Sequence, residues 1–294
     1  MISILTATYN RETNLPDLYN SLVKNLETKV EFEWLIMDDG STDNTKELID
    51  GYIKENKVNI RYFYQENKGK MAAINNLMEY VTGDIIMEVD SDDYLTDNIL
   101  TTVVKDYEAL DDTVVGVIYQ RNIDKDYFPL IKKIPNKTES LFRLHNYYGL
   151  DCDMSLTFKS IYRKGFKYEV EKGEKFVSEA GMYYKIELGS DGFYLNSSKK
   201  LIESKYQEDG YTKNILKVMK NNPKGYYQFF KECLSYDMND VTFKRKIYFI
   251  KHYILFSYLT NTSFKSSLKS LGSNKLLFIL LYIPGIIVSK RRFK

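Results

Sequence analysis

The chain has 294 residues, of which 44% are hydrophobic, so it can fill the core of one large domain or two small ones and is not a disordered protein. Its two cysteines, Cys152 and Cys233, are too far apart in sequence to indicate a disulfide framework or a zinc site. No charged segment with a long apolar run opens the chain, so we expect no signal peptide and a reducing, cytoplasmic environment.

The net charge of +2 conceals an uneven distribution of charge. Residues 241–294 contain eleven Lys and Arg and neither Asp nor Glu, whereas the rest of the chain contains 31 basic and 40 acidic residues. Such polarity between chain ends is typical of a segment that meets a polyanion, either a membrane surface or nucleic acid.

The first hundred residues alternate between the two periodicities of regular secondary structure. Apolar runs bounded by polar residues predict strands at 2–8, 32–37, 60–64 and 84–89. Apolar residues at helical spacing predict helices at 14–27, 43–56 and 70–81, entered through the caps or near-caps Asn14, Asp43 and Asn67. This order predicts an α/β fold with a mostly parallel sheet and helices on both faces.

Beyond residue 110 the pattern is less regular. It predicts one further strand at 114–121, and helices at 140–148, 173–187, 221–237 and 243–259. The two histidines of the chain, His145 and His252, are interpreted as structural or surface residues.

Polar clusters follow three of the predicted strands: 8–11, 38–43 and 90–93. Ligands of parallel α/β sheets bind beyond the carboxyl ends of the strands, so these clusters are expected to converge on one site. No Walker loop, G-x-G-x-x-G, H-E-x-x-H or G-x-S-x-G motif is present, which disfavours dinucleotide-dependent redox chemistry, zinc proteolysis and serine hydrolysis.

The carboxylates of the acidic cluster, Asp90, Asp92 and Asp93, repel one another unless a positive group lies between them. Mg²⁺ and Mn²⁺ take oxygen ligands, commonly one or two carboxylates together with a diphosphate. Asp90 and Asp92 can turn to the same side if the strand continues, which favours a divalent metal site. The alternative is an ordinary helix start, in which the aspartates cap the helix and favour its dipole.

Two further clusters allow nucleotide binding. Asp38 and Asp39 end an apolar strand, and an acidic acceptor there can take the imide proton of uracil, although Ser41 or Thr42 could equally cap a helix. Lys68 and Lys70 flank Gly69 at a helix start, where backbone amides and ammonium groups favour a phosphate.

Four segments resemble, in order and spacing, the nucleotide-sugar-binding half of the GT-A fold family 2 glycosyltransferases: 2–22, 35–45, 67–75 and 87–98. A weaker likeness to the acceptor-side segments of bacterial members continues at 173–186 and 206–212. The resemblance implies a GT-A domain with a nucleotide-sugar half at 1–105 and an acceptor half at 106–210. A helical region at 211–294, with a basic and hydrophobic tail, would follow.

The resemblance also implies roles for single residues. It places Thr8, Tyr9 and Asn10 in the loop beside the nucleotide base, Asp39 on the uracil and Lys70 near the diphosphate. Further along the chain it places Asp90 near the ribose or sugar and Asp92 on Mn²⁺ or Mg²⁺, a role that Asp93 could share or take.

The implied reaction is inverting transfer of a sugar from a UDP-sugar to a hydroxyl of a glycan or lipid-linked glycan, in capsule, exopolysaccharide or cell-wall polymer synthesis. This chemistry needs a base for the hydroxyl proton and a metal for the leaving diphosphate. The resemblance places the base at Glu179, with Glu174 as the alternative. A first-turn glutamate interacting with the helix dipole is the structural reading of Glu179.

Other readings remain open. A sugar nucleotidyltransferase also needs a nucleotide fold and acidic metal ligands, but no Gly-rich loop follows the first strand. A catalytically silent member of the fold could instead serve as a membrane-associated partner of another transferase. The sugar, hexose or N-acetylhexosamine, the acceptor, the linkage and the oligomeric state are not set by any motif.

The basic segment ends in a thirteen-residue apolar run, 276–288, interrupted by Pro284 and Gly285 and followed by Lys290, Arg291 and Arg292. A bilayer span needs about 20 residues, so this run is expected to lie in the membrane interface or to pack as a helix. Anionic lipids would attract its basic flank. We therefore expect peripheral attachment to the inner face of the cell membrane, with an oligomerisation helix as the alternative and no nucleic-acid binding.

Overall fold

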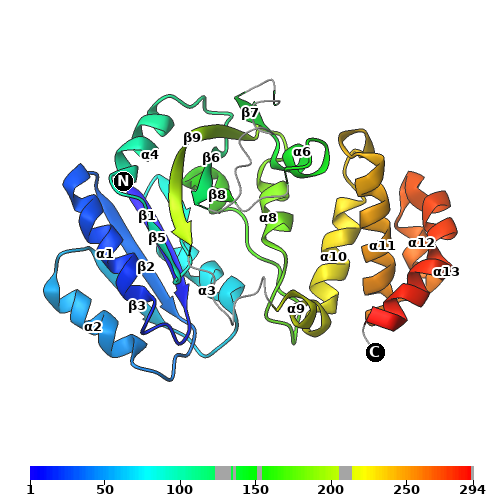
Figure 1. Cartoon of the computed structure of the whole chain (residues 1–294), viewed down its shortest axis with the longest axis horizontal. Coiled ribbons are helices and arrows are strands. Elements are labelled where there is room, and N and C mark those ends of the chain that lie inside the picture. Colours follow the sequence, from blue (N-terminus) through cyan, green and yellow to red (C-terminus); the bar gives the residue numbers. More distant parts are fainter. Residues whose placement is uncertain (123–133, 135–136, 151–153, 205–213, 293–294) are drawn as a thin grey trace. The chain divides into compact units, whose positions relative to one another are not determined.

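The structure is a computed structural model of the chain that describes residues 1–122, 134, 137–150, 154–204 and 214–292 (Figure 1). The chain forms two compact units, each built from several segments. Unit 1 comprises residues 1–141, 150–167 and 184–207, and unit 2 comprises 142–149, 168–183 and 208–294. The segment 206–212, which resembles an acceptor-side motif, lies outside the described residues.

Four parallel strands form the first half of the sheet in unit 1. They are β1 (Ile2–Thr8), β2 (Phe32–Asp38), β3 (Ile60–Tyr64) and β4 (Ile85–Glu88), in the spatial order β3-β2-β1-β4. Their bounds agree with the strands predicted from the apolar runs. The order places the ends of β1, β2 and β4, and hence the three polar clusters, along one edge.

The connecting helices are α1 (Leu15–Asn25), α2 (Thr45–Glu55) and α3 (Lys70–Leu77). Asp43 is a near-cap, since it precedes the cap residue Asn44 and its carboxylate accepts a hydrogen bond from the Thr45 amide at 3.1 Å. Asn14 precedes α1 but its side chain makes no capping hydrogen bond. Asn67 is not a cap, because α3 begins after Gly69, whose φ of +94° suits a residue without a Cβ.

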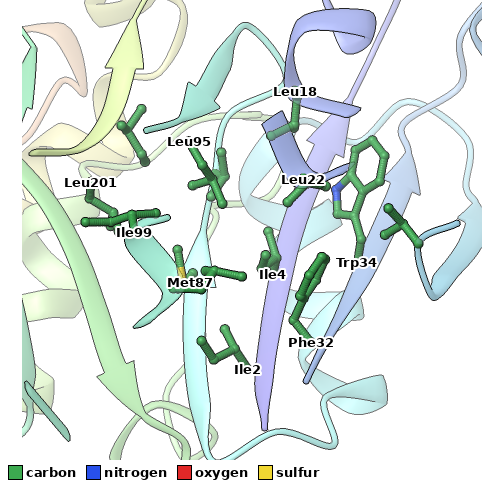
Figure 2. Close-up of a cluster of buried hydrophobic side chains, with 14 of the residues drawn as sticks. Ile2, Ile4, Leu18, Leu22, Phe32, Trp34, Met87, Leu95, Ile99 and Leu201 are labelled. Atoms are coloured by element: carbon green, nitrogen blue, oxygen red, sulfur yellow. The ribbon is translucent and has the colours of Figure 1, made fainter. Parts of the chain in front are cut away.

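The core of unit 1 lies between this sheet and helices α1, α2 and α4 (Ile99–Glu108). Alternate strand residues point to one face of a sheet, and Ile2 and Ile4 of β1 accordingly belong to the same core cluster as Leu18 and Leu22 of α1 (Figure 2). Trp34 is fully buried there. Helix α3 packs against β1 and β2, and its buried residues are not part of this core.

Five strands complete the sheet: β8 (Met154–Lys159), β6 (Gly116–Asn122), β9 (Phe193–Ser204), β5 (Asp93–Leu95) and β7 (Thr138–Glu139). β8 joins β4 and β6 in antiparallel register. Only β6 was expected, and β8 was missed although its residues, Met-Ser-Leu-Thr-Phe-Lys, alternate strictly between apolar and polar. A register shift between β6 and β9 falls at Gln120, one residue before Arg121.

The remaining helices are α6 (Leu141–Asn146), α7 (Ser160–Arg163), α8 (Glu179–Ile186), α9 (Ile215–Asn221), α10 (Pro223–Cys233), α11 (Phe243–Leu259), α12 (Phe264–Lys269) and α13 (Lys275–Arg292). Short 3₁₀ turns cover 26–28, 78–80, 238–240 and 272–274. The expected helix at 173–187 is shorter than predicted and begins at Glu179. The apolar run 276–288 forms part of the helix α13, which continues through Pro284.

Candidate active site

The loop after β1 is tied to the loop after β2. The Asn10 amide donates a hydrogen bond to Ser41 Oγ at 2.9 Å, and Asn10 Oδ1 accepts one from the Thr42 amide at 2.8 Å. Asn10 has a φ of +52°, a conformation that asparagine tolerates better than most residues. Ser41 and Thr42 therefore hold the two loops together and do not cap α2.

Thr8 and Tyr9 present different surfaces beside this loop. Thr8 is buried, and its hydroxyl has no hydrogen-bond partner among the described residues. The Tyr9 ring is 45% exposed. The pair therefore offers one buried polar atom and one accessible aromatic face.

Asp39 holds the loop that leads into α3. Its carboxylate is buried and accepts hydrogen bonds from the amides of Lys68 at 2.7 Å and Gly69 at 2.8 Å, and from the Gln65 side chain at 2.7 Å. A carboxylate has about four acceptor positions, so one remains for a ligand donor. The neighbouring Asp38 is structural, since it accepts from Ser41 N at 2.7 Å and Tyr62 Oη at 2.9 Å.

Lys70, the first residue of α3, pairs with an aspartate of the acidic cluster. Its ammonium lies 2.6 Å from Asp90 Oδ1, and both side chains are partly exposed, 23% for the lysine and 39% for the aspartate. Burial raises the pKa of Asp90, but the charges of Lys70 and Arg121 outweigh burial, so this pKa lies below its ordinary value. Asp90 is therefore an anion held against a cation at the edge of the sheet.

The pKa of Asp92 is shifted in the opposite direction to that of Asp90. Burial and the adjacent charge of Asp90 raise the pKa of Asp92 above its ordinary value. No Lys or Arg lies within ion-pair distance of Asp92 in the part of the chain that the structure describes. A cation at this position would relieve the repulsion between the two carboxylates.

Asp93 points elsewhere, into a buried ion pair with Arg121. Its side chain is 3% exposed, and its amide donates to the Asp90 carbonyl at 3.0 Å. Arg121 also donates to Ser204 Oγ at 3.1 Å, so the pair joins β5, β6 and β9. Sequence reasoning missed Arg121, although a lone cation ending the strand predicted at 114–121 is a signal in a site with three aspartates.

These residues fit a divalent metal bound together with a substrate. Among the described residues, no three His, Cys, Asp or Glu side chains are arranged to hold a metal ion by themselves. Mg²⁺ sites commonly use one or two carboxylates plus substrate phosphates, a set that Asp92 and a diphosphate would supply. The geometry therefore favours Asp92 as ligand over Asp93, whose carboxylate is engaged by Arg121.

Glu179 and Glu174 belong to unit 2 and have different surroundings there. Glu174 caps α10, since its two carboxylate oxygens accept from the Lys224 and Gly225 amides, each at 2.8 Å. Asn222 Oδ1 accepts from the amides of residues 175 and 176, which fixes the same segment. Glu179 is the first residue of α8 and is partly exposed.

Residues 3–166 match the sequence model of glycosyl transferase family 2. The chain belongs to this family. The match covers the whole first half of the sheet and every polar cluster described above, so the family resemblance and the α/β fold inferred from four short motifs are confirmed.

Named relatives and solved structures agree with this membership. Glycosyltransferase GlyG of Streptococcus pneumoniae is 28% identical over 217 residues, which cover 68% of this chain and 66% of GlyG. Poly(ribitol-phosphate) beta-N-acetylglucosaminyltransferase TarS of Staphylococcus aureus is 37% identical over 95 residues, 32% of this chain and 16% of TarS. The chain thus spans slightly less than two thirds of GlyG and a small part of TarS.

Three solved structures share the fold at low identity. The structure of TarS residues 1–349 has a TM-score of 0.61 at 16% identity, covering 99% of this chain and 89% of that one. The same fragment bound to UDP-GlcNAc has a TM-score of 0.57 at 19% identity, covering 92% and 79%. Mannosyltransferase PcManGT of Pyrobaculum calidifontis, with GDP-Man and Mn²⁺, has a TM-score of 0.57 at 15% identity, covering 99% and 83%.

Proposed function

We propose that this protein is an inverting glycosyltransferase that moves a sugar from a UDP-sugar to a hydroxyl of a glycan acceptor, with a divalent metal bound at Asp92. The observation that carries the proposal is the arrangement of Asp92 beside the Lys70–Asp90 pair in a family 2 chain. The UDP-GlcNAc bound by TarS and the Mn²⁺ bound by PcManGT support the donor and metal classes.

The donor nucleotide would bind over the loops after β1 and β2. The exposed ring of Tyr9 offers a stacking face for the base, and the buried Thr8 would support the loop beneath it. The remaining acceptor position of Asp39 would receive the imide proton of uracil. Because Asp39 is fixed by three hydrogen bonds, the orientation of this acceptor is set before the nucleotide arrives.

The diphosphate would lie between Asp92 and the start of α3. When bound, Mg²⁺ or Mn²⁺ supplies charge neutralisation of the leaving diphosphate. Lys70 adds a positive charge there, and Asp90 orients the Lys70 ammonium through the 2.6 Å contact. Asp90 would also accept hydrogen bonds from ribose or sugar hydroxyls through its exposed part.

Glu179 would act as the base that takes the proton of the attacking acceptor hydroxyl. Glu174 is the poorer candidate, because both of its oxygens are committed to the start of α10. A lipid-linked glycan of a capsule, exopolysaccharide or cell-wall polymer is the proposed acceptor, and the transferred group a hexose or N-acetylhexosamine. The name of TarS, a poly(ribitol-phosphate) beta-N-acetylglucosaminyltransferase, supports a cell-surface polymer.

The donor site is tested by isothermal titration of UDP into the full chain, with Mn²⁺ and with EDTA. Wild type is expected to bind UDP in Mn²⁺ and at least about tenfold more weakly in EDTA, and Asp92→Asn to lose this difference. Asp97→Asn, at an aspartate that is 69% exposed and paired only loosely with Lys24 at 3.6 Å, is the matched control and should behave as wild type. Absence of UDP binding in every condition contradicts the proposal.

The base is tested by UDP release from UDP-GlcNAc, UDP-glucose and UDP-galactose, with bacterial membrane lipids as acceptor source. Glu179→Gln is expected to reduce turnover at least about 100-fold while UDP binding stays unchanged. Glu174→Gln is the matched comparison, expected to retain turnover and to lower the free energy of unfolding by about 1 kcal/mol through its weakened cap. UDP binding without turnover in wild type would instead indicate a catalytically silent partner.

A further inference from the structure

Helix α13 of unit 2 carries a continuous exposed apolar face, which we call the α13 stripe: Leu276, Ile279, Leu280, Ile283, Ile287 and Val288. Leu276, Leu280 and Ile283 are 65–71% exposed. Leu276, Leu280, Ile283 and Ile287 recur at intervals of four and three residues, so they share one side of the helix, and Ile279 and Val288 lie at its two edges. Scattered exposed leucines are ordinary on a protein surface, but a row of this length marks a contact surface.

The opposite side of α13 is packed against unit 2. Phe278 is fully buried and contacts the rings of Tyr253 in α11 and Phe264 in α12. A Cβ at Gly285 would lie 2.9 Å from Ile254 of α11, so the two helices are close enough to need a glycine. The helix is thus a fixed part of unit 2, with the stripe on the side that unit 2 leaves uncovered.

By length and composition the segment 272–291 could cross a membrane, and only 17% of it is buried. A span would have to take α11 into the hydrocarbon, because α11 packs along α13. α11 carries the exposed Lys251 near its middle and Lys244 in its first turn. Charged side chains facing lipid at membrane depth are strongly unfavourable, so the packing favours a helix lying in the plane of the interface.

Basic residues follow the stripe at the C-terminal end of α13. On a helix with 100° per residue, Lys290 and Arg291 lie on either side of the line through Leu276, Leu280 and Ile287, and both are exposed. No Asp or Glu occurs anywhere in residues 241–294. An apolar helix side that ends in cations, with no acidic residue nearby in the sequence, matches the boundary between acyl chains and anionic headgroups.

We propose that the α13 stripe docks this protein in the plane of an anionic membrane surface, with its apolar side chains in the acyl boundary and Lys290 and Arg291 on the headgroups. The attachment is monotopic: α11 and α12 stay on the water side and the chain does not cross the bilayer at α13. This inference does not depend on the donor or on the reaction.

The test is co-sedimentation of the full chain with phosphatidylcholine vesicles, with and without phosphatidylglycerol. Wild type is expected to sediment with the anionic vesicles and much less with the neutral ones. Lys290→Gln/Arg291→Gln should weaken binding to anionic vesicles about 25-fold, since each cation near such a surface strengthens binding about fivefold. Leu280→Glu/Ile283→Glu should weaken it at least about tenfold.

Ile161→Glu is the matched control, because Ile161 is an 84% exposed aliphatic residue of unit 1 and the substitution is chemically the same. It should bind vesicles as wild type does, and thermal unfolding followed by circular dichroism should show all variants folded. Wild type that stays in the supernatant with anionic vesicles overturns the proposal. A second result would also overturn it: wild type is a dimer in sedimentation equilibrium and Leu280→Glu/Ile283→Glu is a monomer. A second copy of the chain would then cover the stripe.

Spanning is distinguished from surface docking by washing membranes from expressing cells with alkaline carbonate. Release of the protein into the wash supports a helix lying in the interface. Retention until detergent is added shows a spanning α13 and overturns the proposed orientation.

Discussion

The ion pair of Asp93 and Arg121 is a buried charge contact beside the proposed donor site, with the aspartate side chain 3% and the arginine side chain 21% exposed. Burial raises the pKa of Asp93 and the arginine opposes that rise, so the aspartate depends on its partner to remain an anion. Removal of one member of such a pair leaves an uncompensated group in a site with little water.

Arg121→Gln is therefore expected to lower the free energy of unfolding by about 3 kcal/mol. Urea unfolding followed by circular dichroism measures this change. Lys46→Gln, which breaks the exposed pair of Lys46 with Asp50 at 2.6 Å, is the control and should cost less than about 0.5 kcal/mol. The double variant Asp93→Asn/Arg121→Gln should recover part of the loss, and equal losses in the single and double variants would contradict the coupling.

Helix α13 shows at the scale of an element why a glycine inside a helix need not be a weakness. Glycine costs up to about 1 kcal/mol in a helix relative to alanine, because it loses more backbone freedom on folding. At Gly285 a larger residue would cost more than glycine does, because α11 lies close by and its Ile254 is fully buried and cannot easily move aside. At Gly51 of α2 a Cβ would meet nothing within 4 Å.

The two glycines are expected to respond to alanine with opposite signs. Gly51→Ala should raise the free energy of unfolding by about 0.5–1 kcal/mol, since only the backbone contribution changes. Gly285→Ala should lower it by about 1 kcal/mol, because overpacking of about 1–3 kcal/mol exceeds the gain in helix propensity. Urea titrations of the two variants measure both changes in the free energy of unfolding. A stabilising Gly285→Ala would mean that α11 and α13 are not tightly packed.

Across the whole molecule, the charge states of buried groups make stability depend on pH. Burial, together with the smaller effect of the Arg245 charge, lowers the pKa of His145 from 6.5 to about 4. Above pH 6.5 the imidazole is neutral in both folded and unfolded chains. Below pH 6.5 His145 becomes protonated in the unfolded chain but stays neutral in the folded chain. The free energy of unfolding therefore falls as the pH falls towards 4.

Wild type should consequently lose more stability between pH 7 and pH 5 than His145→Gln does, by about 2 kcal/mol at most. Circular dichroism reports unfolding of both units, and the fluorescence of Trp34, the single tryptophan, reports the core of unit 1. Because His145 lies in unit 2, the effect should appear in circular dichroism. Identical pH dependence of wild type and variant would show that His145 is protonated in the folded chain.

The sequence by itself determined the first half of the fold and predicted where the candidate site would lie. Local patterns are strong there: four apolar strands alternate with amphipathic helices, and the chirality of parallel connections brings the clusters after Thr8, Asp38 and Asp90 to one edge. Helix 243–259 was likewise predicted to the residue, because its apolar spacing is unbroken.

Only the tertiary structure decided which charges meet. The residues Asp93 and Arg121 are 28 apart in sequence, and their contact depends on the register shift between β6 and β9. Glu174 is distinguished from Glu179 by the start of α10, fifty residues further along the chain. The side of α13 that packs on α11 is likewise a matter of tertiary contacts, and the helix continues through Pro284. Such contacts join distant segments, and no local periodicity of a single segment encodes them.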